Sequence, residues 1–288
     1  MSVEPVSHRF RSQTLDLHYV EWGDRDRPTL ILQHGGNDHA RSWDRLARAL
    51  SDRFRVVAPD LRGHGDSGWS SDGNYSVNAC VYDLRALYRA LGVETAAIIG
   101  HSFGGMVASR YAGLYPETVR HMVVIEGLGL SRGWVETWLA TPVEQRLLAY
   151  FEQIDTALAT EARPYARIED VAARLRAHNP RLSSELALHL AGHATRLGPD
   201  GMLRWKFDLR FRARAPIDLS TEERRRLRWR IDAPVLLIDG SESPLAGPAE
   251  AYTEFRDARR LLVEGAGHWV QHDGFDEVAA ACREFLGA

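Results

Sequence analysis

The chain has 288 residues, of which 44% are hydrophobic and 26% charged, so it can bury a large core and has the size of one elaborated α/β domain. Its formal net charge of −3 gives no electrostatic reason to expect nucleic acid or a membrane surface, and no apolar run approaches the ~18 residues of a spanning helix. The first residues lack the apolar segment of a secretory signal, so we expect a soluble, cytoplasmic protein whose two cysteines are free thiols.

In chain order, short apolar runs alternate with longer amphipathic stretches. The stretch LDLHYVEWG, 15–23, alternates polar and apolar residues and predicts an antiparallel hairpin at one edge of a sheet. Helical patterns at 77–91, 103–115 and 275–286 separate later runs that are rich in Val, Ile and Leu, which is typical of parallel strands buried on both faces. These later strands are predicted at 29–34, 54–59, 95–100, 121–126, 234–239 and 259–265. The order predicts an α/β fold with a mostly parallel, doubly wound, eight-stranded sheet.

One interval breaks this alternation. Between 131 and 230 the sequence has helical patterns rich in Ala, Leu, Glu and Arg, and no strand-like apolar run. We therefore predict a core formed by 1–130 and 231–288, with a helical lid, 131–230, inserted between strands 6 and 7. Because ligands of open α/β sheets bind beyond the carboxyl ends of the strands, this lid would lie over the binding site.

The strongest chemical signal is AAIIGHSFGGMVA, 96–108. A predicted strand ends at Gly100, Ser102 stands in a Gly-x-Ser-x-Gly frame, and a predicted helix begins directly afterwards. The glycines permit a sharp turn that lifts the hydroxyl above the sheet edge at a helix N-terminus. We interpret Ser102 as a nucleophile; the alternative is a serine that only caps the helix.

Two further segments supply candidate partners for this serine. In LILQHGGNDHARSW, the glycines after His34 leave backbone N–H groups uncrowded, so Gly36 and Phe103 are the predicted donors of an oxyanion hole; a plain glycine turn is the alternative. In LLVEGAGHWVQHDGF, His268 lies in a glycine-rich loop after the final strand and is the predicted base. His272 is the competitor, but it stands near the start of the last helix.

The motifs HGGND, VVAPDLRGHGDS, GHSFGGMVA, HMVVIEGLGL and GAGHWVQHDGF, in this order, resemble the α/β-hydrolase superfamily. The resemblance is to its lidded branch, which works without a cofactor and contains esterases, lactonases, C–C hydrolases, haloperoxidase-like enzymes, epoxide hydrolases and haloalkane dehalogenases. The last two carry an aspartate at the elbow, where this chain has Ser102, so their chemistries are disfavoured. Asp60 and Arg62, in the shared stretch DLRGHGDS, are expected to serve the fold.

The triad acid is the open question. In serine hydrolases of this type a carboxylate is expected a few residues beyond the glycine of PVLLIDGSESPL, but Ser243 stands there. Glu126 ends the preceding predicted strand at the same edge of the sheet, and similar dehalogenases and lactonases take their acid from this strand. We therefore predict Glu126 as the acid, within about 2.6–3.2 Å of the histidine nitrogen that faces away from Ser102. Glu242 and Asp239 remain the alternatives.

The resemblance implies a hydrolase that cleaves a carboxylic ester or lactone of a hydrophobic or aromatic small molecule through an acyl-enzyme, with no metal and no cofactor. A C–C bond hydrolase or a haloperoxidase-like enzyme with the same triad, or a receptor that binds a small molecule without turnover, remain alternatives. We expect no partner beyond the substrate, with a homodimer left open. The candidate substrate contacts are His34, Trp134, Trp138, Trp205 and Trp269. The alternative is that the aromatic residues, at helical spacing, pack the lid onto the core.

Overall fold

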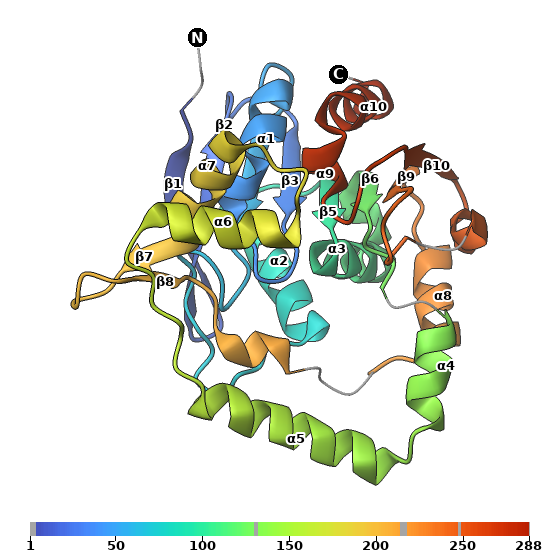
Figure 1. The fold of residues 1–288 in the computed structure, drawn as a ribbon. Coiled ribbons are helices and arrows are strands. Elements are labelled where there is room, and N and C mark those ends of the chain that lie inside the picture. Colours follow the sequence, from blue (N-terminus) through green and yellow to red (C-terminus); the bar gives the residue numbers. More distant parts are fainter. Residues whose placement is uncertain (1–3, 130–131, 214–217, 247–248, 288) are drawn as a thin grey trace.

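An eight-stranded sheet forms the centre of the computed structural model, which describes residues 4–129, 132–213, 218–246 and 249–287 (Figure 1). Its strands lie in the spatial order β1-β2-β4-β3-β5-β6-β9-β10. Their bounds are β1 Val6–Ser12, β2 Leu15–Trp22, β3 Thr29–Gln33, β4 Arg55–Pro59, β5 Ala96–His101, β6 Val119–Ile125, β9 Val235–Gly240 and β10 Ala258–Val263. The predicted fold class and strands are confirmed, with ends that shift by one or two residues.

The pairing is parallel among β3, β4, β5, β6, β9 and β10. The first two strands, β1 and β2, form the predicted antiparallel hairpin, and β2 also pairs antiparallel with β4. The register brings the carboxyl ends of the central strands together, since Gln33 lies opposite Gly100 and His101 lies opposite Ile125. Residues that directly follow these strands therefore meet at one edge of the sheet, where ligands of open α/β sheets bind.

Helices cover both faces of the sheet. On one face α2 (Val77–Leu91) and α3 (Phe103–Leu114) pack against residues such as Ile31, and on the other face α1 (Asp44–Leu50) and α10 (Phe275–Leu286) pack against residues such as Leu30. Alternate residues of each strand thus lie in two separate cores, one on each face of the sheet, which explains the continuous apolar runs. Cys80 and Cys282 are buried in opposite cores, and both are free.

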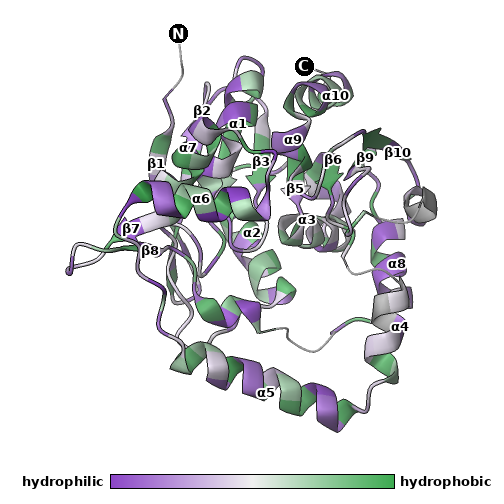
Figure 2. Cartoon of the chain, viewed as in Figure 1, coloured by the Kyte–Doolittle hydropathy of each residue, from purple (hydrophilic) through white to green (hydrophobic). Residues whose placement is uncertain are grey.

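The chain between β6 and β9 contains α4 (Arg132–Ala140), α5 (Val143–Ala159), α6 (Ile168–His178), α7 (Ser184–Ala194) and α8 (Thr221–Trp229). It also contains two short strands, β7 (Thr195–Leu197) and β8 (Leu203–Trp205), so the expectation of helices alone is wrong here. Residues of α6 and α7 form a small core of their own. Figure 1 shows α5 as an outlying arm, and Figure 2 shows both hydrophobic and hydrophilic residues along it.

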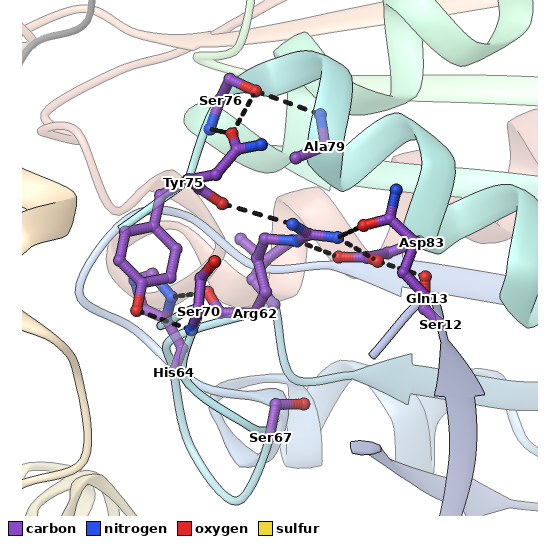
Figure 3. Close-up of polar contacts among 12 residues, drawn as sticks. Ser12, Gln13, Arg62, His64, Ser67, Ser70, Tyr75, Ser76, Ala79 and Asp83 are labelled. Atoms are coloured by element: carbon purple, nitrogen blue, oxygen red, sulfur yellow. Dashed lines mark hydrogen bonds and ion pairs between the residues drawn. The ribbon is translucent and has the colours of Figure 1, made fainter. Parts of the chain in front are cut away.

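The turn after β4 is held by buried polar contacts. Asp83 accepts bidentate hydrogen bonds from Arg62, at 2.6 and 2.7 Å, and a third from the Ser12 hydroxyl (Figure 3). Asp60 accepts the backbone N–H groups of Ala40 and Asp66. Asp60 and Arg62 therefore join turns of the fold, as predicted from the motif. Within the described ranges, no helix has the length and apolar character needed to span a lipid bilayer.

Candidate active site

Ser102 lies in the turn between β5 and α3. Its φ of 51° and ψ of −119° are a strained backbone conformation for a residue with a side chain, and its N–H donates to the carbonyl of Ile125. The turn is possible because Gly104 lies against the end of β3, where an added Cβ would approach the Gln33 carbonyl oxygen to 2.3 Å. The sequence therefore folds Ser102 upward, clear of the sheet edge, at the start of a helix.

His268 follows β10 in the loop before α9 (Val270–Asp273), and its Nε2 lies 3.0 Å from Ser102 Oγ. The ring of His101 steadies this loop, because its Nε2 donates to the His268 carbonyl at 2.9 Å. Burial and the neighbouring His268 hold the pKa of His101 well below its usual range, so His101 is neutral. The competitor His272 instead contacts the Ser42 hydroxyl at 3.1 Å.

Glu126 is the first residue after β6, and its side chain is completely buried beside His268. One carboxylate oxygen, Oε2, lies 3.3 Å from His268 Nδ1, just beyond the predicted range. Oε1 accepts the N–H of Gly240 at 2.8 Å, and Oε2 also accepts the hydroxyl of Ser243 at 2.6 Å. These donors compensate the cost of burying a carboxylate, and the pairing gives His268 the tautomer with Nδ1–H toward the acid and Nε2 toward Ser102.

The two alternative acids have other partners. Asp239 is buried, and its Oδ2 accepts a hydrogen bond from Arg260 at 2.8 Å. Glu242 is exposed and forms an ion pair with Arg181. Ser243, which stands where the acid of such hydrolases is expected, instead donates a hydrogen bond to the carboxylate of Glu126.

The loop after β3 lies beside the serine. A Cβ added to Gly35 would lie 3.2 Å from Ser102 Cβ, so Gly35 packs against Ser102, and Gly36 is the next residue of the loop. The N–H of Phe103, as the first residue of that helix, has no acceptor within the helix. His34 is fully buried, its Nδ1–H donates to the Gly35 carbonyl at 2.7 Å and its Nε2 accepts the Leu61 N–H at 2.9 Å. Both ring nitrogens of His34 thus support the loop, and its role as a substrate contact stays a prediction.

Phe211 is a site neighbour that the sequence analysis missed. It lies in the short helix η3 (Leu209–Arg212) of the inserted segment, with its ring centroid 5.0 Å from that of Phe103 and 4.4 Å from that of His64. A Cβ on Gly36 would come within 2.5 Å of the Phe211 ring, so the ring rests directly on this glycine. The segment RWKFDLRFRARAP alternates charged and apolar residues, a period that favours a strand, whereas Phe211 lies in a short helix.

The predicted aromatic contacts are dispersed. Trp205 stacks on Phe207 and packs, as does Trp269, against the small core of α6 and α7. Trp138 lies on α4 with Arg146 over its ring, and the side chain of Trp134 lies outside the described residues. The packing interpretation therefore accounts for Trp205 and Trp269, and a substrate contact by any of these residues stays a prediction.

Two groups of residues within the described ranges could in principle hold a metal ion: Asp44 with His189 and His193, and His18 with Asp60 and Asp66. Neither includes Ser102, Glu126 or His268. In both groups a carboxylate is already hydrogen-bonded, since Asp44 accepts two hydrogen bonds from Arg41 at 2.7 Å and Asp60 lies 2.7 Å from the ring of His18. The groups that the described contacts bring together at Ser102 are the imidazole of His268 and, behind it, the carboxylate of Glu126.

A protein-family model described as "alpha/beta hydrolase fold" matches residues 28–275. The chain is 35% identical over 118 residues to epoxide hydrolase 4 of Mus musculus, a match covering 41% of this chain and 33% of that protein. It is 29% identical over 283 residues to a 3-hydroxybutyrate-oligomer hydrolase of Cupriavidus necator, covering 94% and 92% of the two chains. Among solved structures, a thioesterase domain from the curacin biosynthetic pathway has a TM-score of 0.84 at 22% identity, covering 96% of this chain and 99% of that one, which establishes likeness of fold.

Proposed function

We propose that this chain, which belongs to the α/β-hydrolase family, is a serine hydrolase that cleaves a carboxylic ester or lactone of a hydrophobic small molecule. The observation that carries the proposal is the distance of 3.0 Å between His268 Nε2 and Ser102 Oγ, with the other ring nitrogen facing the buried carboxylate of Glu126. This is the relation of nucleophile, base and orienting acid that activates a serine for acyl transfer.

In the first half of the reaction, His268 takes the proton of Ser102 as Oγ attacks the substrate carbonyl. The N–H groups of Phe103 and Gly36 stabilise the negative oxygen of the tetrahedral intermediate, and Glu126 stabilises the histidinium. His268 then gives the proton to the leaving alcohol, and an acyl-enzyme on Ser102 remains. In the second half, His268 takes a proton from water, which attacks the ester carbonyl, and the acid leaves as the proton returns to Ser102.

Two comparisons bear on the bond that is cleaved. An epoxide hydrolase is expected to carry an aspartate at the elbow, where this chain has Ser102, so the likeness to epoxide hydrolase 4 does not favour epoxide opening. The likeness to the 3-hydroxybutyrate-oligomer hydrolase extends over almost the whole of both chains and supports an ester substrate. The inserted segment, which brings Phe211 against the loop of Gly36, would act as a lid and favour an apolar acyl group.

The proposal is tested by turnover of purified protein on a panel of p-nitrophenyl esters, lactones, dienones and an epoxide, each assayed with wild-type protein and with Ser102→Ala. We expect saturable hydrolysis of esters or lactones that falls about 10³-fold or more in Ser102→Ala, while circular dichroism stays unchanged. Turnover confined to the dienones or the epoxide, or binding without turnover, would contradict the ester assignment.

A further inference from the structure

A second site of different character lies between α3 and α8, the last helix before the chain returns to the sheet. Here the described residues line a partly open cavity of about 30 Å³. Its walls include Ser109 and Arg110 from α3, Arg224 and Arg228 from α8, and apolar side chains such as Met106. One water needs roughly 10–15 Å³ by this measure, so the cavity has room for about two waters or one small anion.

The arginines of this wall outnumber their carboxylate partners. Arg110 is paired with Asp218, and Arg228 is paired with Glu254. Across the described ranges, Arg224 has no carboxylate within ion-pair distance, and its hydrogen-bond partner is the Thr221 hydroxyl at 3.2 Å. Burial and the neighbouring Arg228 lower the pKa of Arg224. Glu254 and Asp218 are near enough to offset part of this effect, but each is already paired with another arginine, so the partly buried Arg224 charge is compensated only in part.

The remaining polar group of the wall also lacks a partner. Ser109 Oγ is buried and has no hydrogen-bond partner among the residues that the structure describes. A serine inside a helix commonly bonds the carbonyl one turn earlier, and Ser109 does not. The polar lining thus consists of a hydroxyl and guanidinium N–H groups, which makes it rich in donors and poor in acceptors. Such a lining matches an anion better than a cation or a neutral acceptor-poor group.

We propose that this cavity binds a small monovalent inorganic anion, with chloride as the probe. The anion would balance Arg224 and accept hydrogen bonds from both helices, and so would tie α8 to α3, the helix that begins next to Ser102. Arg228 extends the connection, because it also donates to the carbonyl of Leu128, just beyond Glu126. Anion binding would therefore stabilise the packing of α8, the end of the inserted segment, against α3, independently of the reaction at Ser102.

The first measurement is the thermal midpoint in sodium chloride and in sodium gluconate of equal ionic strength. Because a ligand that binds only the native state stabilises it by mass action, we expect the midpoint of wild-type protein to be about 2 °C higher in chloride. Arg224→Gln should abolish this difference. Arg225→Gln, on the same helix with a 56% exposed side chain, is the matched control and should retain it.

The second measurement is the ³⁵Cl NMR line width of chloride in the presence of the full chain, which reports binding even if Arg224→Gln does not fold. Wild-type protein and Arg225→Gln should broaden the line. In the thermal measurement, Ser109→Ala should need a higher chloride concentration than wild-type protein to reach half of the full midpoint shift. The proposal is overturned if wild-type protein has the same midpoint in both salts and causes no broadening, or if Arg224→Gln responds to chloride as wild-type protein does.

Discussion

Glu126 has a left-handed backbone, with φ of 52°, which it shares with Ser102. Tertiary packing accounts for the position of Glu126, because the next residue, Gly127, lies against α3 so closely that an added Cβ would approach Gly105 Cα to 2.7 Å. Two residues of the proposed triad thus have strained backbones where the same two segments meet. Strain of this kind persists only where the surrounding contacts enforce it, and it is common at functional sites.

The sequence indicated Glu126 as the acid because it ends a predicted strand at the edge of the sheet that Ser102 follows, and because similar enzymes take their acid from this strand. It could not indicate which groups surround the carboxylate. The hydrogen bond from Ser243 and the pairing of Glu242 with Arg181 depend on loops that meet only in the folded chain. His34 illustrates the same limit, since its place beside the Gly35 turn was evident but its two backbone partners were not.

The role of Glu126 predicts a large kinetic effect of Glu126→Gln. The amide keeps the shape of the side chain but loses the charge that stabilises the His268 cation, so kcat on a p-nitrophenyl ester should fall by about 10²-fold or more. The thermal midpoint should be measured in parallel, to establish that the variant is folded.

Glu242→Gln is the matched control, because Glu242 lies close in sequence to Ser243 but is 59% exposed and bonded to Arg181. Its kcat should stay within about twofold of wild type, since surface ion pairs contribute little. A large loss of kcat in Glu242→Gln, with near-normal kcat in Glu126→Gln, would identify Glu242 as the acid and contradict the assignment to Glu126.

The elements of the core followed the sequence pattern closely, whereas those of the insertion did so only in part. Buried strands have continuous apolar runs, and the helices between them have apolar residues at helical spacing. The strands β3 to β6, β9 and β10 could therefore be placed from the pattern. Strands β7 and β8 have three residues each, too few for any periodicity. An amphipathic pattern predicts that a helix buries one face, but it does not predict which element that face contacts. The contact of η3 with the Gly36 loop could therefore not be predicted from the sequence.

This contact predicts an effect of Phe211→Ala on catalysis. The ring rests on Gly36 and on Phe103, whose N–H groups are the proposed oxyanion donors, so its loss should let both move and lower kcat/KM for a small ester by about tenfold. Phe151→Ala is the comparison, because Phe151 belongs to the same insertion but lies on α5 with 54% of its surface exposed. Equal kcat/KM values in the two variants would remove Phe211 from the site.

The molecule as a whole buries many histidines in their neutral form. Burial lowers the pKa of His34, His193 and His272 to about 4 and that of His39 and His64 to about 3. Their pKa in the unfolded chain is about 6.5, so below that pH the unfolded state binds more protons and the free energy of unfolding falls as the pH falls. Asp38 opposes this trend, because burial raises its pKa to about 7.

We therefore expect the thermal midpoint to fall by at least about 5 °C between pH 7.5 and pH 5, at constant ionic strength. Asp38→Asn should steepen the fall, since it removes the carboxyl group that binds a proton in the native state over this range. Differential scanning fluorimetry across the pH series measures both slopes. A midpoint that is level or rises toward pH 5 would contradict the burial of these histidines as neutral groups.

Ser102, activated by His268 and Glu126, is the nucleophile in the proposed reaction. The most direct test of this role is reaction of the intact protein with a serine-directed fluorophosphonate, followed by mass spectrometry of the whole chain and of its peptides. We expect one adduct, on the peptide that contains Ser102, which is absent in Ser102→Ala and forms more slowly in Glu126→Gln. An adduct on another residue, or wild-type protein that stays unlabelled, would contradict it.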